Sequence, residues 1–253
     1  MNWILLGYSF DTGELLVLAL VAVFIGMAKT GVHGAGMLAV PLLAGVFGGQ
    51  ESSGVMLPIL IMADVMGVWY YRKHASWDHL KLLFPWAAVG IVVGTIAGIF
   101  MDAGVFKAFM AVTILISVMI MIWLEQGPNL VPTARWFGAA SGVAGGFTSM
   151  VGNLAGSVMA VYFLSVRLPK NIFIGTTAWF FIVVNAFKVP FHIFFWKTIS
   201  WDIVILDLML LPLIVIGAIA GIWIVRQFSD RSYRWFIMAM TVLAALSMLI
   251  PIE

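Results

Sequence analysis

Long apolar runs, separated by short polar or glycine-rich breaks, make up almost the whole chain. Ten runs can be delimited, at residues 14–28, 35–48, 54–71, 82–100, 105–124, 134–148, 154–166, 172–195, 203–225 and 233–250. A helix that crosses a membrane needs about 20 apolar residues, and six of the ten runs approach that length. The other four form two short pairs, which meet around 29–34 and 149–153. The pattern predicts an all-α integral membrane fold that contains two pairs of short, broken or re-entrant helices.

The two halves of the chain repeat one another. The stretch VHGAG at 32–36 aligns with GNLAG at 152–156 at an offset of 120 residues, and the triplet SWD at 76–78 recurs at 200–202 at an offset of 124. The offset only increases along the chain, as small insertions in the second copy would produce. We therefore predict a single transmembrane domain, residues 1–253, that contains an internal duplication of five segments.

The distribution of basic residues predicts how the repeats lie in the membrane. The repeats cover about 12–125 and about 132–251, and an odd number of segments inverts the second repeat relative to the first. When the loops are assigned alternately to two faces, Lys107 and Lys197 fall on one face. The other face collects nine basic residues: Arg72, Lys73, Lys81, Arg135, Arg167, Lys170, Arg226, Arg231 and Arg234. Because basic residues are enriched in cytoplasmic loops, both termini are expected to lie outside.

The composition excludes several classes of protein. The chain is 63% hydrophobic and 9% charged, with a net charge of +2, whereas soluble domains are roughly 25% charged. So small a net charge gives no indication of nucleic-acid binding, and the absence of cysteine excludes disulfides and thiolate metal sites. The N-terminus has no basic region and no small-residue cleavage site, so we expect no cleaved signal peptide.

Glycines and polar residues interrupt the two short pairs at KTGVHGAG, residues 29–36, and at TSMVGNLAG, residues 148–156. The helices that flank the first break would be roughly 21–23 Å long, which is shorter than a ~30 Å bilayer core. The pairs either end at depth as two hairpins that enter from opposite faces, or cross fully. In a hairpin, the half-helices that start after His33 and Asn153 would point free N–H groups inward, and such helix ends attract anions.

Charged side chains favour a binding site over plain helix packing, which the glycines alone would indicate. Lys29 and His33 both lie in the first break. Asp64 lies in the middle of the third apolar run, where a lone carboxylate is costly and usually functional. We expect it to pair with Lys29 or Lys188, or to carry a proton.

The third run of the second half places Asn185, Lys188 and His192 on one helical face. Lys188 either faces the site or extends its amine to the interface, as lysines near span ends do. Asp64 and His192 are candidate coupling groups or charge partners. The candidate ligands of a small anion lie in the two breaks and in this run, and they comprise hydrogen-bond donors, cations, glycines and one aromatic residue. They are Lys29, Thr30, His33, Gly34, Gly36, Ser149, Asn153, Gly156, Ser157, Trp179, Asn185 and Lys188.

No catalytic pattern accompanies these residues. The chain has no HExxH, no GxSxG and no paired intramembrane aspartates, and its four histidines are too dispersed for a metal site. We expect neither an enzyme nor a cofactor nor a bound metal. Three classes remain: a secondary transporter, an anion channel that conducts without coupling to an ion gradient, and a membrane assembly subunit that binds no solute.

Two stretches resemble a known family. GVHGAGMLAVP at 31–41, with its copy in the second half, and GTTAWFFIVVNAFKVPF at 175–191 resemble the sulfite exporter TauE/SafE family, also called the toluene sulfonate uptake permeases. The resemblance covers nearly the whole chain and implies a secondary transporter for sulfite, sulfonates or related anions. The chain departs from the family pattern at His33, and its second half lacks a proline that matches Pro41. These departures leave the substrate open.

We therefore expect an inverted-repeat transporter in a bacterial inner membrane, with its site at the facing tips of the two broken pairs. The expected partners are a small sulfur-containing anion, the lipid bilayer and a coupling proton or sodium ion, together with a second copy of the chain in a homodimer. No nucleic acid is expected.

Overall fold

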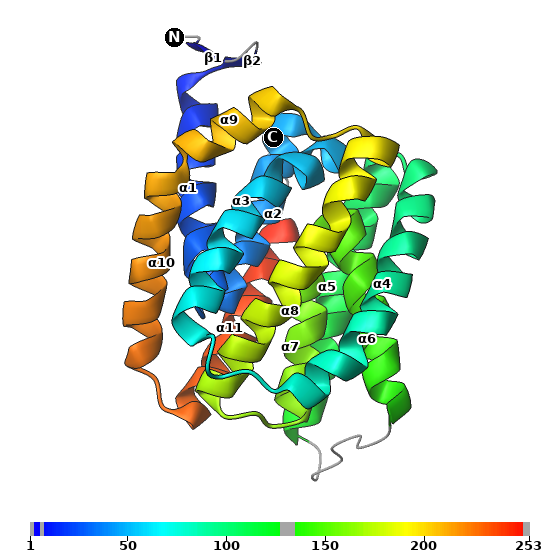
Figure 1. Ribbon diagram of the computed structural model, residues 1–253, viewed down its shortest axis with the longest axis vertical. Coiled ribbons are helices and arrows are strands. Elements are labelled where there is room, and N and C mark those ends of the chain that lie inside the picture. Colours follow the sequence, from blue (N-terminus) through cyan, green and yellow to red (C-terminus); the bar gives the residue numbers. More distant parts are fainter. Residues whose placement is uncertain (1–2, 6–7, 127–134, 250–253) are drawn as a thin grey trace.

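A computed structural model describes residues 3–5, 8–126 and 135–249, and almost all of them are helical (Figure 1). The predicted repeat limits at 132 and 251 and the predicted segment limits at 134 and 250 lie outside these residues. A short antiparallel hairpin of β1 (Trp3–Leu5) and β2 (Tyr8–Phe10), which the sequence did not predict, precedes the helices. The helices are α1 (Thr12–Lys29), α2 (His33–Phe47), α3 (Gly49–Tyr71), α4 (Trp77–Ile99), α5 (Ala103–Gln126), α6 (Arg135–Gly152), α7 (Ala155–Ser165), α8 (Lys170–Phe191), the π-helix η1 (His192–Trp196), α9 (Trp201–Met209), α10 (Leu211–Arg226) and α11 (Asp230–Leu249).

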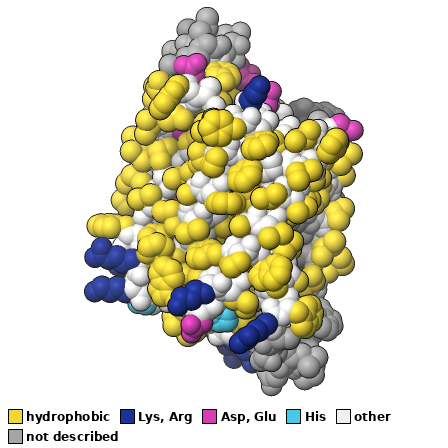
Figure 2. Space-filling view, turned by 45° about the vertical axis from the view of Figure 1, so that its right-hand side comes forward, with side chains coloured by type: hydrophobic (Ala, Val, Ile, Leu, Met, Phe, Trp, Pro, Cys, Tyr) yellow, Lys and Arg dark blue, Asp and Glu magenta, His cyan; other side chains and the backbone are white. Residues whose placement is uncertain are grey.

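Several helices have the length and composition of membrane spans. Within the described part of the chain, four helices qualify, namely α1, α3, α4 and α8 extended by η1, and the bent pair of α9 and α10 makes a fifth when it is counted as one span. Hydrophobic side chains cover the flank of the molecule, as contact with lipid requires (Figure 2). The predicted all-α integral membrane fold is confirmed.

The two halves pack on each other through reciprocal helix pairs. α1 packs mainly against α10 and α6 against α4, while α2 contacts α11, α7 contacts α5, and α3 packs against α8. Exchanging the halves converts the first pair into the second and the third into the fourth, and it leaves the pair of α3 and α8 unchanged. The arrangement supports the predicted duplication, and the opposite orientation of the two repeats stays a prediction.

Four glycines set the spacing of the closest helix pairs. A Cβ atom added at Gly26, Gly217, Gly90 or Gly146 would lie 2.2, 2.1, 2.1 or 2.0 Å, respectively, from a backbone carbonyl oxygen of the facing helix. Real side chains cannot approach that closely, so only glycine permits these contacts. Small residues of this kind allow close approach of membrane helices, since lipid supplies no hydrophobic force between them.

The first helix of each half is longer than expected. α1 begins at Thr12 because Asp11 and Glu14 form a capping box, in which each carboxylate accepts the other residue's backbone N–H at 2.8 Å. α1 and α6 have 18 residues each, whereas α2 and α7 have 15 and 11. Each broken pair therefore combines a helix of nearly full length with a short one.

The run at 203–225, which we expected to be one span, is divided. α9 ends at Met209 and α10 begins at Leu211, with a bend of 52° between their axes. Pro212 lies in the first turn of α10, where a residue without an N–H is tolerated. Figure 1 shows α9 lying across the upper end of the bundle and α10 running down its side.

Basic residues gather at the end of the bundle where the α3–α4, α7–α8 and α10–α11 loops meet, the lower end in Figure 2. Lys170 donates to the carbonyls of Val225, in the last turn of α10, and of Phe228, in the α10–α11 loop. Arg226 donates to the Tyr70 hydroxyl at 3.0 Å, and these bonds tie the loops together. Glu51 and Asp102 line a groove at the opposite end. The charge asymmetry predicted from the alternating loops is therefore present in the fold.

Candidate functional site

The two helix breaks lie where the glycine-rich stretches predicted them. Residues 30–32 separate α1 from α2, and residues 153–154 separate α6 from α7. Gly31 has a φ of 127° and Asn153 a φ of 54°, conformations that glycine adopts freely and asparagine tolerates better than most residues. Since the first residues of α2 and α7 are buried, the free N–H groups of both half-helices lie inside the protein.

Residues of both breaks line one cavity of about 50 Å³ inside the bundle. Gly36 of α2 and Gly156 of α7 form part of its wall, and α3 and α8 contribute apolar side chains. Its polar lining comes from both halves of the chain: Lys29, His33, Ser149, Asn153, Thr177 and Asn185. The structure therefore brings seven of the twelve candidate ligands to one place.

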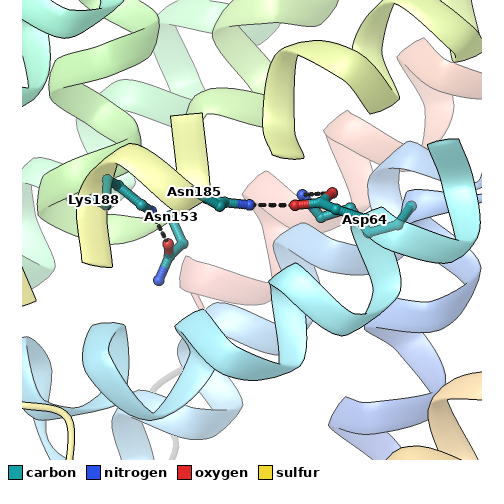
Figure 3. A network of polar contacts seen from close by, with 5 residues as sticks. Asp64, Asn153, Asn185 and Lys188 are labelled. Atoms are coloured by element: carbon teal, nitrogen blue, oxygen red, sulfur yellow. Dashed lines mark hydrogen bonds and ion pairs between the residues drawn. The ribbon is translucent and has the colours of Figure 1, made fainter. Parts of the chain in front are cut away.

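Lys29 is paired with a carboxylate beside the cavity. Its Nζ lies 2.9 Å from Asp64 Oδ1, and the other Asp64 oxygen accepts a hydrogen bond of 2.6 Å from the Asn185 amide (Figure 3). The Lys29 Nζ also lies 3.8 Å from the centroid of the Phe181 ring. Of the alternatives for Asp64, the structure shows the pairing with Lys29, so the charge of Lys29 is compensated.

Lys188 holds the second break. Its side chain is fully buried and does not extend to the interface, and its Nζ donates to the Ser149 carbonyl at 2.9 Å and to Asn153 Oδ1 at 2.7 Å (Figure 3). The Asn153 amide in turn donates to the carbonyl of Ser53 at 3.2 Å and to its hydroxyl at 3.1 Å. Among the described residues no carboxylate forms an ion pair with Lys188. Its amine therefore lies one side chain behind the cavity wall, bound only to neutral acceptors.

Tyr233 of α11 anchors the first break. Its hydroxyl lies 2.6 Å from the Gly31 carbonyl and 2.9 Å from His33 Nδ1, and the His33 ring packs edge-on against Phe173. These contacts fix the ring of His33 at the start of α2, where it lines the cavity. Sequence reasoning missed Tyr233, because nothing local marks a tyrosine that lies 200 residues from its partner.

Three further candidates hold the breaks in place and do not line the cavity. The Thr30 hydroxyl donates to the Ala218 carbonyl of α10 at 3.0 Å, and the Ser157 hydroxyl donates to a carbonyl of its own turn at 2.9 Å. A Cβ at Gly34 would lie 2.0 Å from the Cβ of Met240, so Gly34 permits close contact between α2 and α11. Their roles here are structural.

Trp179 and His192 also lie away from the cavity. Trp179 packs against Trp77, with ring centroids 5.3 Å apart. His192 is fully buried in η1, one turn beyond Lys188, and its Nδ1 lies 2.8 Å from the Thr198 hydroxyl. Neither is among the residues that form the cavity wall.

Sequence reasoning also missed Ser53, Thr177 and Phe181. Ser53 binds Asn153, Thr177 lines the cavity, and Phe181 packs against Lys29. The only available signal was their position: Thr177 and Phe181 lie in the run at 175–191, and Ser53 precedes an apolar run that contains Asp64. Uncharged residues of these types are too common in membrane helices to single out.

The geometry defines a multi-pass membrane protein with a polar cavity between two broken helix pairs, an arrangement typical of secondary transporters. The sequence model of the family "Sulfite exporter TauE/SafE" matches residues 18–248. The chain belongs to this family, which is one of membrane transporters and not of enzymes. No curated protein and no solved structure matches the chain.

Proposed function

We propose that the chain is an ion-coupled secondary transporter that moves a small sulfur-containing anion, such as sulfite or an organosulfonate, across a bacterial inner membrane. The anion binds between the tips of the two broken pairs. The observation that carries this proposal is the shared cavity, because residues of both breaks, from both halves of the chain, line it. A site between two broken helix pairs is accessible from either side when one group of helices moves against the other.

The charges around the cavity favour an anion. Lys29 and Asp64 compensate each other, whereas Lys188 has no acidic partner among the described residues. The N-terminal ends of α2 and α7 add the partial positive charge of free N–H groups. One uncompensated cation in a buried site suits a substrate with a single negative charge, since burial of an unbalanced charge is costly.

The volume of the cavity favours a small ligand. A cavity of about 50 Å³ has room for a few water molecules, whereas a cavity of roughly 150 Å³ is needed to bind benzene. In the described conformation, an inorganic oxyanion or a small alkyl sulfonate fits this space better than an aromatic sulfonate does. Hydrogen bonds from His33, Asn153 and Asn185 would replace its hydration.

Binding of sulfite to the purified protein tests this proposal. We expect sulfite to raise the unfolding temperature and to bind in calorimetry, because a ligand of the folded state stabilises it. Lys188→Gln should weaken binding about ten- to a hundredfold, because it removes the positive charge behind the cavity wall; the attraction of two buried unit charges across one side chain is worth roughly 1.5–3 kcal/mol, and each 1.4 kcal/mol is tenfold.

Lys197→Gln is the matched control, because Lys197 is an exposed lysine beyond the end of the same helical segment. This control should bind sulfite within about twofold of the unaltered protein. Equal dissociation constants for both variants would assign Lys188 a purely structural role. If sulfite, sulfonates and sulfate all fail to bind, the proposed function is wrong.

We propose further that the basic end of the bundle faces the cytoplasm and that both termini lie outside. The chain has no cysteine, so single cysteines can be introduced without background. Cysteines at the exposed positions Lys73 and Arg231 should react with an impermeant thiol reagent only from the cytoplasmic side. Cysteines at Glu51 and Asp202 should react only from outside. Labelling of Lys73→Cys and Arg231→Cys from opposite sides would rule out the proposed topology.

A further inference from the structure

Asp207 is a fully buried carboxyl group with no partner. It lies in α9 on the same inward face as the buried residues Ile203 and Leu206. Neither of its carboxylate oxygens has a hydrogen-bond partner among the described residues. Buried polar groups in folded proteins are almost always paired, so an unpaired carboxyl requires an explanation.

No cation in the described part of the chain is paired with Asp207. Of the acidic side chains on α9 and on α3, which packs against it, Asp64 is held by Lys29, and Asp202 and Glu51 are exposed. Among the described residues, no lysine, arginine or histidine forms an ion pair with Asp207. The titratable groups on the helices that pack against α9, namely α3 and α10, are Glu51, Asp64, Tyr70, Tyr71 and Arg226. An ionised carboxylate in such a site costs at least several kcal/mol, so the group carries its own proton in this conformation.

Asp207 lies at the break in a span, within an insertion. Nine residues separate Asp202 from Pro212 (203–211), whereas six separate Asp78 from Pro85 (79–84) in the matching part of the first half. The first half forms the continuous helix α4 there, while the second half forms α9, a bend of 52° and α10. The additional residues therefore coincide with the break and with the buried carboxyl. Broken helices are where many secondary transporters bind their coupling ions.

Packing connects Asp207 to the cavity. Its neighbour Leu206 and Ile214 of α10 belong to the same buried cluster as Ile25 and Leu60, and the latter two line the cavity. Close-packed side chains transmit displacements, because the interior has few voids that could absorb them. A rearrangement of α9 that exposes Asp207 to water would therefore change the cavity wall.

We propose that Asp207 binds and releases the proton that couples anion transport to the proton gradient, an inference that rests on the proposed transport function. The carboxyl is protonated while α9 is packed as described. It releases its proton to water when α9 moves and exposes it. A proton fits better than a sodium ion, because a metal ion needs several ligands and the described residues contain no group of three or more acidic, histidine or cysteine side chains that could hold one.

Infrared spectroscopy tests the protonation state directly. At neutral pH, the difference spectrum between the purified protein and its Asp207→Asn variant should contain the C=O stretching band of a protonated carboxylic acid. Asp202→Asn removes an exposed acid of the same helix and should give only the bands of an ionised carboxylate. If the Asp207 difference spectrum shows an ionised carboxylate, the proposal is overturned.

Proteoliposomes test the coupling. With a pH gradient imposed, Asp207→Asn should lose sulfite accumulation against a concentration gradient but retain exchange of internal for external sulfite, because exchange needs no net proton movement. Asp207→Glu, which keeps a titratable carboxyl, should recover part of the accumulation, and Asp202→Asn should behave as the unaltered protein. Accumulation by Asp207→Asn at the unaltered level would refute the role of Asp207. If the unaltered protein neither binds nor moves sulfite, the transport function fails, and the infrared band alone still decides whether Asp207 holds a proton.

Discussion

Replacement of Gly36 or Gly156 by leucine should abolish anion binding, while the protein remains folded and inserted in the membrane. Both glycines line the cavity of about 50 Å³, and a leucine adds four carbon atoms to that space. At Gly36 the new Cβ would lie 3.0 Å from the Cβ of Ala28, so α1 and α2 must separate by a few tenths of an ångström to accept it. The measurement is sulfite binding by calorimetry, with correct folding checked by size-exclusion chromatography.

Gly45→Leu is the control for α2. A Cβ at this position meets nothing within 4 Å, and the residue is exposed on the same helix as Gly36. This variant should bind sulfite as the unaltered protein does. Normal binding by Gly36→Leu or Gly156→Leu would place the anion somewhere other than at that tip.

Removal of Asp64 alone should be the most destabilising change near the site. Asp64→Leu leaves Lys29 buried and without its ion-pair partner, a change that costs about 3–5 kcal/mol. In the double variant Lys29→Met/Asp64→Leu, apolar groups of similar volume replace both charges, and such replacements are often neutral or stabilising. Unfolding of the detergent-solubilised proteins in denaturant should therefore show a large loss for the single variant and recovery in the double variant.

A measurement of sulfite binding by the same two variants distinguishes a loss of stability from a loss of function. The double variant lacks the Lys29 ammonium at the cavity and the Asp64 acceptor that orients Asn185, so it should bind sulfite weakly even though it is stable. Comparable stability of the single and double variants would mean that Lys29 and Asp64 do not form a coupled pair. Full sulfite binding by the double variant would remove both residues from the site.

Local signals in the sequence located the breaks, because glycines, Lys29 and His33 interrupt apolar runs where lipid would exclude them. The internal repeat carries a further signal. Asp64 and Asn185 lie 121 residues apart, at equivalent positions of the two halves, and their side chains are hydrogen-bonded where α3 packs against α8. Residues at equivalent places in two halves meet when they lie near the axis that relates the halves. The repeat therefore contained a signal for this contact, although we predicted only that Asp64 pairs with Lys29 or Lys188 or carries a proton.

Other contacts depend on the rotation of each helix about its own axis, which an apolar sequence does not specify. Examples are the hydrogen bond between Tyr233 and His33 and the one between Ser53 and Asn153. The division of the span at 203–225 was also hidden, because the run is apolar on both sides of the bend. Pro212 and Asp207 are its only markers, and each is also compatible with a continuous helix at the membrane surface.

The glycine contacts between α1 and α10 and between α4 and α6 have a consequence for how the molecule assembles. The first helix of each half finds its closest partner only in the other half. Either half alone would leave a glycine-lined backbone surface uncovered, so we expect that neither half folds by itself. The two halves exchange helices within one polypeptide, as the subunits of a domain-swapped dimer do between two chains. A hairpin that moves must carry a helix of the opposite half with it, and this linkage makes independent opening of the two tips mechanically unfavourable.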